Sequence, residues 1–430
     1  MIRSRRASRA GASLLCVALA ACSHGGLSPI PSGAPGHTPP SFNGYRSGSA
    51  GYKSIYSFGS KSQDGFDPLG NLLTVAGKLY GTTQFGGKTT AQCYLGCGTV
   101  FSVTTSGAES VTYRFQGGAD GEAPVAGLLS YGGALFGTTS GGGSGCSGGC
   151  GTVFELSAGG KSEKVLYAFK GGTDGAQPVA GLVAMNGTLY GTTQYGGKRT
   201  RLCAQGCGTI FSLTTSGAEN VLYRFKGGSD GALPAARLVA IRGALYGTTQ
   251  YGGSTTAVCS TGCGTVFQAG ASGTKKTLYS FKYQPSAGDG AYPAAGVVAV
   301  NGEVFGTTMG GGSFGDGTVF AVNESSGAER IVHSFDCCVS SSDGQYPLSR
   351  LIAVEGTLYG TTRQGGTSNV GTIFKVTPAG AESVLHSFGG KPDGALPEAS
   401  LTLHAGVLYG VASSGGNSSE GSIFRLTPSN

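Results

Sequence analysis

Residues 174–225 read DGAQPVAGLVAMNGTLYGTTQYGGKRTRLCAQGCGTIFSLTTSGAENVLYRF, and close copies of this stretch fill the chain from residue 51 onward. Asn186-Gly187, after a short apolar run, is the two-residue signal of a β-hairpin. The apolar pattern on either side predicts strands over 182–185, 188–193, 208–214 and 220–225. Four short strands joined by tight turns are typical of one antiparallel sheet.

Three short motifs recur seven times with a period of about 55 residues. An Asp-Gly pair precedes Tyr-Gly-Thr-Thr, or a variant of it, by a constant 16 residues, and Gly-Thr-Val-Phe or a close relative follows both. The aspartates are Asp64, Asp120, Asp174, Asp230, Asp289, Asp343 and Asp393. Self-similarity at a fixed period is the signature of a repeat architecture.

The two ends of the repeat array complement each other. The last repeat contains three expected strands and ends with 421–427, whereas residues 52–58 (YKSIYSF) resemble a fourth strand that lacks the other three. Pairing the two segments would close a ring and remove exposed sheet edges. The sequence therefore predicts an all-β, seven-bladed β-propeller with four antiparallel strands per blade, closed by the N-terminal strand in the last blade. The alternative is a β-solenoid, but about 55 residues is long for one coil, and no capping repeat is visible.

Composition and charge exclude several classes of protein. With 82 glycines, 39 Tyr and Phe residues and only 12% charged residues, the chain is neither disordered nor mainly helical. The net charge of +7 falls to +3 once four arginines of an expected signal segment are removed (7 − 4). That charge is too small and too scattered for a nucleic-acid partner. We also expect no cofactor and a monomer.

Residues 1–21 are typical of an export signal. Four arginines precede an apolar run over about 10–21 that is too short to span a bilayer. Leu19-Ala20-Ala21-Cys22 resembles the bacterial lipobox, which implies cleavage before Cys22 and acylation of that cysteine. We therefore expect a membrane anchor made by the lipid on Cys22.

Two other interpretations of this segment stay open. Cys22 could lie by chance beside an ordinary cleavage site, and Arg5-Arg6 could belong to a twin-arginine signal, although Ala7 and Ser8 replace its apolar pair. After the signal, residues 22–50 contain five prolines among Gly and Ser, which is typical of an extended tether. The expected order is signal (1–21), tether (22–50) and propeller (51–430).

The seven copies of Asp-Gly, Leu-Tyr-Gly-Thr-Thr and Gly-Thr-Val-Phe resemble the GloVer tandem repeat of bacterial choice-of-anchor proteins, over about 380 residues. The resemblance implies an exported protein held in the cell envelope by one of several kinds of anchor. Here that anchor would be the lipid on Cys22, since no apolar tail follows the seventh repeat. The resemblance implies no activity and no catalytic residues.

Two kinds of loop are long in every repeat. One leads into the first strand (the lead-in loop), and the other joins the second strand to the third (the middle loop). Both lie on the same side of a propeller blade, which we call the long-loop face. Because binding residues favour variable loops on a rigid scaffold, we expect this face to carry any ligand site.

The first four middle loops each carry a C-x3-C pair and are longer than the other three. They hold 14, 11, 14 and 14 residues, against 8 in each of the rest. The pairs are Cys93 with Cys97, Cys146 with Cys150, Cys203 with Cys207, and Cys259 with Cys263. An exported chain meets oxidising conditions, so small disulfide rings are expected. Zinc and thiol exchange fit less well, because no His follows at ligand spacing and C-x3-C is not C-x-x-C. Cys337-Cys338 is left without an assigned partner.

The seven Asp-Gly aspartates are expected to shape turns. Asp accepts backbone N–H groups in a turn, and the following Gly supplies a positive φ. A ring of Ca²⁺ sites is the alternative, but Ca²⁺ needs six to eight oxygens in one place. We therefore predict no metal site.

One position breaks the repeat, just before the first strand. Its residues are Asn71, Gly127, Gly181, Arg237, Gly296, Arg350 and Ser400. If first strands line the channel, Arg237 and Arg350 lie at its mouth beside Asn71 and could bind a carboxylate or acidic sugar. Lys198, Arg199 and Arg201, in the third middle loop, are further candidates. The alternative is that these are ordinary solvated side chains.

Catalysis finds little support in the sequence. His333 and His386 take the place of a fourth-strand Tyr, and no His, acid and nucleophile stand together. We expect a lipid-anchored cell-envelope protein whose non-catalytic propeller binds a glycan or an envelope protein through its long-loop face. The alternatives are a hydrolase or lyase acting on extracellular polysaccharide, and a purely structural surface protein.

Overall fold

The computed structural model describes residues 51–157, 160, 162–283, 288–336 and 342–428. All described residues belong to one compact unit, Ser47–Asn430. The expected signal (1–21), the expected tether (22–50) with Cys22, and the pair Cys337-Cys338 lie outside the described residues.

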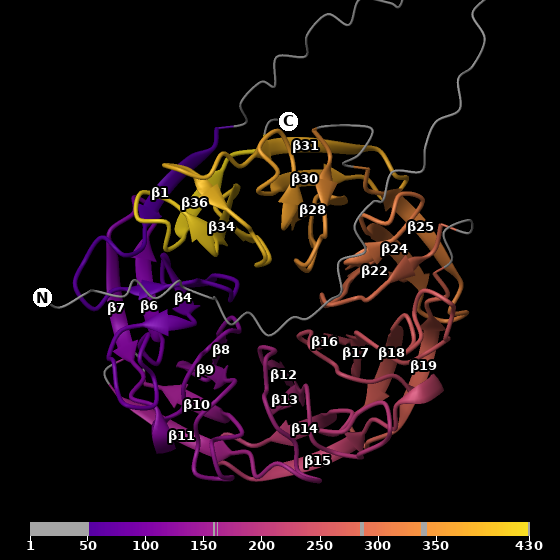
Figure 1. Ribbon diagram of the computed structural model, residues 1–430, viewed down its shortest axis with the longest axis horizontal. Helices are drawn as coiled ribbons and strands as arrows, with labels where there is room; N and C mark the ends of the chain where they lie inside the picture. The colour runs from indigo at the N-terminus through magenta and orange to yellow at the C-terminus, as the bar shows by residue number, and fades with distance from the viewer. Residues whose placement is uncertain (1–50, 158–159, 161, 284–287, 337–341, 429–430) are drawn as a thin grey trace, which may run out of the picture. The chain divides into compact units, whose positions relative to one another are not determined.

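Seven four-stranded antiparallel sheets follow one another around a ring, each running from the centre outward (Figure 1). In blade 3 the strands are β12 (Val183–Met185), β13 (Thr188–Thr193), β14 (Thr209–Leu213) and β15 (Glu219–Arg224). These bounds lie within one residue of the predicted strands. The predicted all-β, seven-bladed propeller is confirmed.

The other blades have the same order of strands. Blade 1 contains β3 (Leu73–Val75), β4 (Lys78–Thr83), β6 (Thr99–Thr104) and β7 (Glu109–Arg114); blade 2 contains β8 (Leu129–Tyr131), β9 (Ala134–Thr139), β10 (Thr152–Leu156) and β11 (Glu163–Ala168). Blade 4 contains β16 (Val239–Ile241), β17 (Ala244–Thr249), β18 (Thr265–Gly270) and β19 (Lys275–Ser280); blade 5 contains β21 (Val298–Val300), β22 (Glu303–Thr308), β24 (Thr318–Asn323) and β25 (Glu329–Ser334). Blade 6 contains β27 (Ile352–Val354), β28 (Thr357–Thr362), β30 (Thr372–Val376) and β31 (Glu382–Ser387); blade 7 contains β33 (Thr402–His404), β34 (Val407–Ala412), β36 (Ser422–Leu426) and β1 (Lys53–Ser57).

Short ribbons and turns complete the described secondary structure. The ribbons pair β2 (Gly65–Phe66) with β5 (Phe85–Gly86), β20 (Gly290–Ala291) with β23 (Gly310–Gly311), β26 (Gly344–Gln345) with β29 (Gln364–Gly365), and β32 (Gly394–Ala395) with β35 (Ser414–Gly415). Two 3-10 turns, η1 (Gly118–Asp120) and η2 (Gly228–Asp230), have three residues each. No helix in the described part of the chain has the length and apolar character needed to cross a membrane.

The N-terminal strand closes the ring, as predicted. β1 pairs antiparallel with β36, from Lys53 opposite Arg425 to Ser57 opposite Ser422. In Figure 1, indigo β1 lies on the outer side of yellow β36. The pairing contains the same one-residue bulge that is found between the third and fourth strands of the other six blades. β1 is therefore the fourth strand of blade 7.

The repeated Gly and Phe build the contacts between blades. Gly191 lies opposite Phe211, and a Cβ on Gly191 would meet the Phe211 ring at 2.5 Å, so only glycine leaves room for that ring. Phe211 then packs edge-on against Phe169 of the preceding blade, with ring centroids 5.0 Å apart. The same edge-on pair occurs at all seven seams between blades, with centroids 5.0 to 5.3 Å apart. These fully buried rings form the core that holds neighbouring blades together.

Candidate functional site

The lead-in and middle loops lie on one side of the ring because they pair with each other. In blade 1 the ribbon of β2 and β5 joins them, with Gly65 opposite Gly86. Similar ribbons occur in blades 5 to 7, and single bridges join the loops in blades 2 to 4. The two loops of every blade therefore form one layer, the long-loop face.

All four predicted C-x3-C disulfides are formed, which confirms the pairing expected within each of the first four middle loops. The bonds join Cys93 to Cys97, Cys146 to Cys150, Cys203 to Cys207, and Cys259 to Cys263. The four pairs differ in depth. Cys259 and Cys263 are fully buried, whereas Cys150 is only partly buried and packs at the edge of the core between blades 2 and 3.

Each disulfide ring lies against the next lead-in loop. Cys203 and Cys207 are buried beside Phe225, and a Cβ on Gly227 would lie 3.1 Å from the Cys207 sulfur. A Cβ on Gly171 would likewise lie 3.0 Å from the Cys150 sulfur. The disulfide thus fixes its middle loop against the lead-in loop that follows.

One disulfide has an acidic neighbour. Glu122 lies beside the pair of Cys93 and Cys97. Because the two sulfurs are bonded to each other, they offer no thiolate to a metal. This cluster is therefore not a metal site while the disulfide is intact.

Exposed apolar side chains project from these loops, a feature that sequence reasoning missed. Tyr94 is 79% exposed and Leu95 follows it, both inside the first disulfide ring; Leu202 and Val258 each precede a paired cysteine. Phe314, in the fifth middle loop, is half exposed. An apolar residue beside a paired cysteine, in loops otherwise rich in small and polar residues, was the available signal.

A cavity of about 300 Å³ lies at the channel, lined by first-strand residues of blades 1, 6 and 7 and by Asn71, Arg237 and Arg350. Arg237 and Arg350 come just before β16 and β27, the innermost strands of blades 4 and 6. Three of the predicted binding residues thus meet at one cavity. Lys198, Arg199 and Arg201 lie in their loop and do not line it.

Glycines make room for the large side chains around this mouth. A Cβ on Gly296 would lie 3.2 Å from Cδ of Arg350, and one on Gly181 would lie 3.6 Å from Cδ of Arg237. A Cβ on Gly127 would clash with Oδ1 of Asn71 at 2.3 Å. At the position just before the first strand, where the repeat is broken, each large residue is therefore paired with a glycine in a neighbouring blade.

The two arginines carry positive charge that nothing described in the structure neutralises. Neither guanidinium forms an ion pair or donates a hydrogen bond to a described residue, and no described carboxylate lines the cavity. Burial, together with the charge of Arg350, lowers the pKa of Arg237 to about 10, and burial also lowers the pKa of Arg350. Both groups still carry a proton at neutral pH. The site can therefore offer several N–H donors and two positive charges to an anion.

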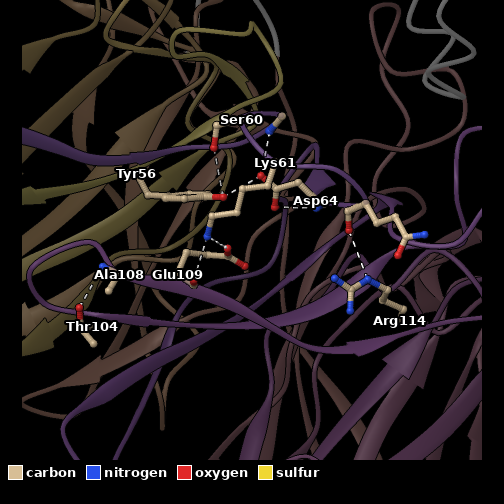
Figure 2. Close-up of polar contacts among 11 residues, drawn as sticks. Tyr56, Ser60, Lys61, Asp64, Thr104, Ala108, Glu109 and Arg114 are labelled. Carbon is tan, nitrogen blue, oxygen red and sulfur yellow. Dashed lines mark hydrogen bonds and ion pairs between the residues drawn. The ribbon is translucent and has the colours of Figure 1, made fainter.

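The Asp-Gly aspartates lie at the seams, away from the channel cavity. Asp230 accepts a hydrogen bond from the Lys226 amide at 2.8 Å and another from the Tyr223 hydroxyl at 2.7 Å. Figure 2 shows the equivalent seam between blades 7 and 1, where the Tyr56 hydroxyl points at Asp64. Each of the seven carboxylates accepts at least one backbone N–H group in this way.

A glutamate from the next blade faces the same carboxylate in several seams. Glu163, Glu219 and Glu329 each begin a fourth strand, at β11, β15 and β25. Burial and a neighbouring aspartate raise the pKa of Glu163 to about 8 and the pKa values of Glu219 and Glu329 to about 7. In Figure 2, the ammonium group of Lys61 contacts the equivalent Glu109 at 2.9 Å. The repeat therefore places paired acids between blades.

Residues 44–258, 144–365 and 253–430 match the Gloeobacter/Verrucomicrobia repeat. The chain belongs to this repeat family. The predicted family resemblance is thereby confirmed, and no curated protein matches the chain.

Several solved structures are similar to this chain at low sequence identity. A Bacteroides uniformis protein assigned provisionally as a 6-phosphogluconolactonase is 14% identical, with a TM-score of 0.49, over 78% of this chain and 89% of that one. The propeller domain of the Trilobed protease from Pyrococcus furiosus is 8% identical, with a TM-score of 0.46, over 85% and 94%. An oligogalacturonate lyase in complex with manganese is 8% identical, with a TM-score of 0.46, over 82% and 86%. No substrate or activity follows from these likenesses for the repeat family.

Proposed function

We propose that this repeat protein is a lipid-anchored binding protein of the bacterial cell envelope. Its long-loop face would take an acidic sugar of a glycan, with the sugar carboxylate held between Arg237 and Arg350. The observation that carries the proposal is the pair of uncompensated guanidinium groups at one cavity.

The energetics of this pair favour an anionic ligand. Two like charges in a partly desolvated cavity repel each other, and each has lost part of its hydration. A bound carboxylate would offset the repulsion between the two positive charges. It would also accept two parallel N–H hydrogen bonds from the planar guanidinium group of either arginine. The glycines of neighbouring blades leave room for the arginine side chains themselves, and the cavity beside them is open to a ligand.

The size of the cavity favours one sugar unit over a long chain. Its volume of about 300 Å³ lies at the lower end of small-molecule sites, which range from about 300 to 1,000 Å³. Apolar walls formed by side chains such as Ile352 and Leu401 suit the carbon face of a sugar ring. We therefore propose that the site binds the end of an acidic glycan or an acidic branch.

The proposed location rests on the disulfides and on the N-terminal sequence. Four disulfides are typical of an oxidising compartment outside the cytoplasm. The sequence of residues 1–21 and the acylation motif at Cys22 support export and anchoring, and 22–50 would serve as the tether. Labelling the expressed protein with radioactive palmitate, with Cys22→Ala as the control, tests the anchor.

Isothermal titration calorimetry of the full chain with uronate-containing and neutral oligosaccharides tests the ligand. We expect saturable binding of the acidic series, weakened by salt, and no binding of the neutral series. Arg237→Met combined with Arg350→Met should weaken binding at least tenfold. Arg242→Met is the matched control, because it removes a charge from the same blade at the hairpin on the opposite side of the ring.

Three other outcomes would each contradict the proposal. Equal affinity of the double variant and the unaltered chain would remove the arginine pair as the site. Release of shortened or unsaturated sugars would instead favour the polysaccharide hydrolase or lyase. An absence of binding to both acidic and neutral sugars would favour a structural surface protein or a protein partner.

A further inference from the structure

The seam between blades 5 and 6 brings together three side chains that commonly bind metals. His333 lies on β25, Asp343 lies in the sixth lead-in loop, and Glu382 begins β31. One ligand atom from each, a ring nitrogen or a carboxylate oxygen, lies within 4.8 Å of the other two. The cluster joins two blades, and its members are up to 49 residues apart in the sequence (382 − 333).

Two polar atoms of this cluster are buried without a partner. Nε2 of His333 and Oε1 of Glu382 are closed off from solvent, and neither makes a hydrogen bond to a described residue. Nε2 lies 3.5 Å from Oδ2 of Asp343, beyond the usual N–H···O range of about 2.7 to 3.2 Å. An open Oε1 also occurs at the equivalent glutamates of four other seams, so the open imidazole nitrogen is what distinguishes this one. Buried polar atoms in proteins are nearly always satisfied, so a buried imidazole nitrogen left open beside two carboxylates points to a ligand between them.

The next seam provides an internal comparison. There His386 occupies the position of His333, but its Nε2 lies 3.0 Å from Oδ2 of Asp393, within hydrogen-bond distance. Tyr52 takes the position of the glutamate. Its ring stacks on that of His386 with ring centroids 3.5 Å apart, and its hydroxyl donates a hydrogen bond to Asp393. In five further seams a tyrosine hydroxyl donates to the aspartate at 2.7 to 3.0 Å. Among the seven described seams, only that of blades 5 and 6 lacks such a bond and combines His, Asp and Glu.

We propose that His333, Asp343 and Glu382 bind a divalent transition metal, with Zn²⁺ as the best fit, and thereby link blades 5 and 6. Imidazole and carboxylate are ordinary Zn²⁺ ligands. Two ligands of a tetrahedral ion bound at about 2.0 to 2.2 Å lie about 3.4 Å apart, close to the His333–Asp343 separation of 3.5 Å. Ca²⁺ fits less well because it takes six to eight oxygens and avoids imidazole.

The repeat itself supplies the decisive variant. His333→Tyr restores the residue found in five other seams, so the variant should fold while losing the nitrogen ligand. The metal-free full chain is titrated with ZnCl₂ by calorimetry, and its melting temperature is measured with and without Zn²⁺. We expect one more Zn²⁺ per unaltered chain than per His333→Tyr chain, and a Zn²⁺-dependent rise in melting temperature that the variant lacks.

Two further variants distinguish this site from other Zn²⁺ binding. His386→Tyr makes the same exchange in the seam between blades 6 and 7, where the histidine already contacts an aspartate, and should leave Zn²⁺ affinity and stoichiometry unchanged. Glu382→Gln keeps the side-chain shape, removes the negative charge and should weaken binding at least tenfold, which decides the matter if His333→Tyr proves unstable. Absence of saturable Zn²⁺ binding, or equal binding by Glu382→Gln and the unaltered chain, would overturn the proposal.

Discussion

The seams between blades and the mouth of the channel are built from the same seven repeats, yet only the phenylalanine core of the seams is uniform. Every seam contains the same edge-on phenylalanine pair. The mouth instead carries one asparagine, three glycines, two arginines and one serine at equivalent positions. Each blade must pack on a neighbour, so packing explains what is repeated. Ring closure does not require the arginines, because blades with glycine there close equally well.

The two regions also differ in their expected effect on stability. The seams bury large apolar rings, which favours folding by the hydrophobic effect and by close packing. The mouth holds two partly buried like charges that no described residue neutralises, which opposes folding. A site that opposes stability and departs from its repeat is where a binding function is expected.

The largest effect is expected from breaking a seam. Phe211→Ala removes a fully buried ring that packs on Phe169 and leaves a cavity between blades 2 and 3. We expect a loss of about 3 to 5 kcal/mol in the free energy of unfolding, measured by urea denaturation. Phe314→Ala, at a half-exposed ring, is the control and should change stability by no more than about 0.5 kcal/mol. Similar losses for both variants would mean that the seam rings do not form the core.

Removing an arginine from the mouth should have the opposite sign. Arg237→Met takes away a partly buried charge and its repulsion with Arg350 while replacing the unbranched stem of the side chain with one of similar length. We expect the free energy of unfolding to rise by about 1 kcal/mol without ligand. Arg330→Met, which breaks the 2.9 Å ion pair with Glu303, should lower it slightly. A loss of stability in Arg237→Met would show that the guanidinium has a structural role.

Regular features of the chain were predictable from the sequence. The Asp-Gly spacing, the tight hairpins and the unmatched strand over 52–58 predicted the blades and their closure, because these depend on contacts within a repeat or on a count of strands. The C-x3-C spacing predicted the disulfides for the same reason, since both partners lie in one loop.

Contacts between blades were not predictable in the same way. Glu219 lies 45 residues from Asp174 (219 − 174), and Glu382 lies 49 from His333. Whether such residues meet depends on how far one blade is turned and shifted against the next, which the period of a repeat does not specify. From the sequence alone, His333 was therefore interpreted only as a replacement for a fourth-strand Tyr, and no metal site was predicted. The channel mouth was an intermediate case, because its position followed from the fold but the unpaired state of Arg237 did not.

The smallest expected effect concerns the paired acids of the seams. Glu219 faces Asp174 and Tyr167, with Lys170 and Arg224 nearby, and its folded pKa of about 7 exceeds the usual value of about 4.5 in an unfolded chain. Between those pH values the folded chain holds the proton more tightly than the unfolded chain, so stability falls as pH rises through this window and then levels off. Glu163, with a pKa of about 8, acts in the same direction.

We therefore expect the melting temperature of the chain to be lower at pH 8.5 than at pH 5.5. Glu219→Gln should reduce this drop, because a permanently neutral amide does not lose a proton; after allowance for solvent screening, the difference corresponds to about 0.5 kcal/mol. Glu355→Gln, at an exposed hairpin, is the matched control and should leave the pH dependence unchanged. Scanning calorimetry at the two pH values decides. An equal fall in melting temperature for Glu219→Gln and Glu355→Gln would place the pH sensitivity outside this seam. A smaller fall for Glu219→Gln alone would mean that the contacts holding the blades together, and not the channel mouth, respond to protons.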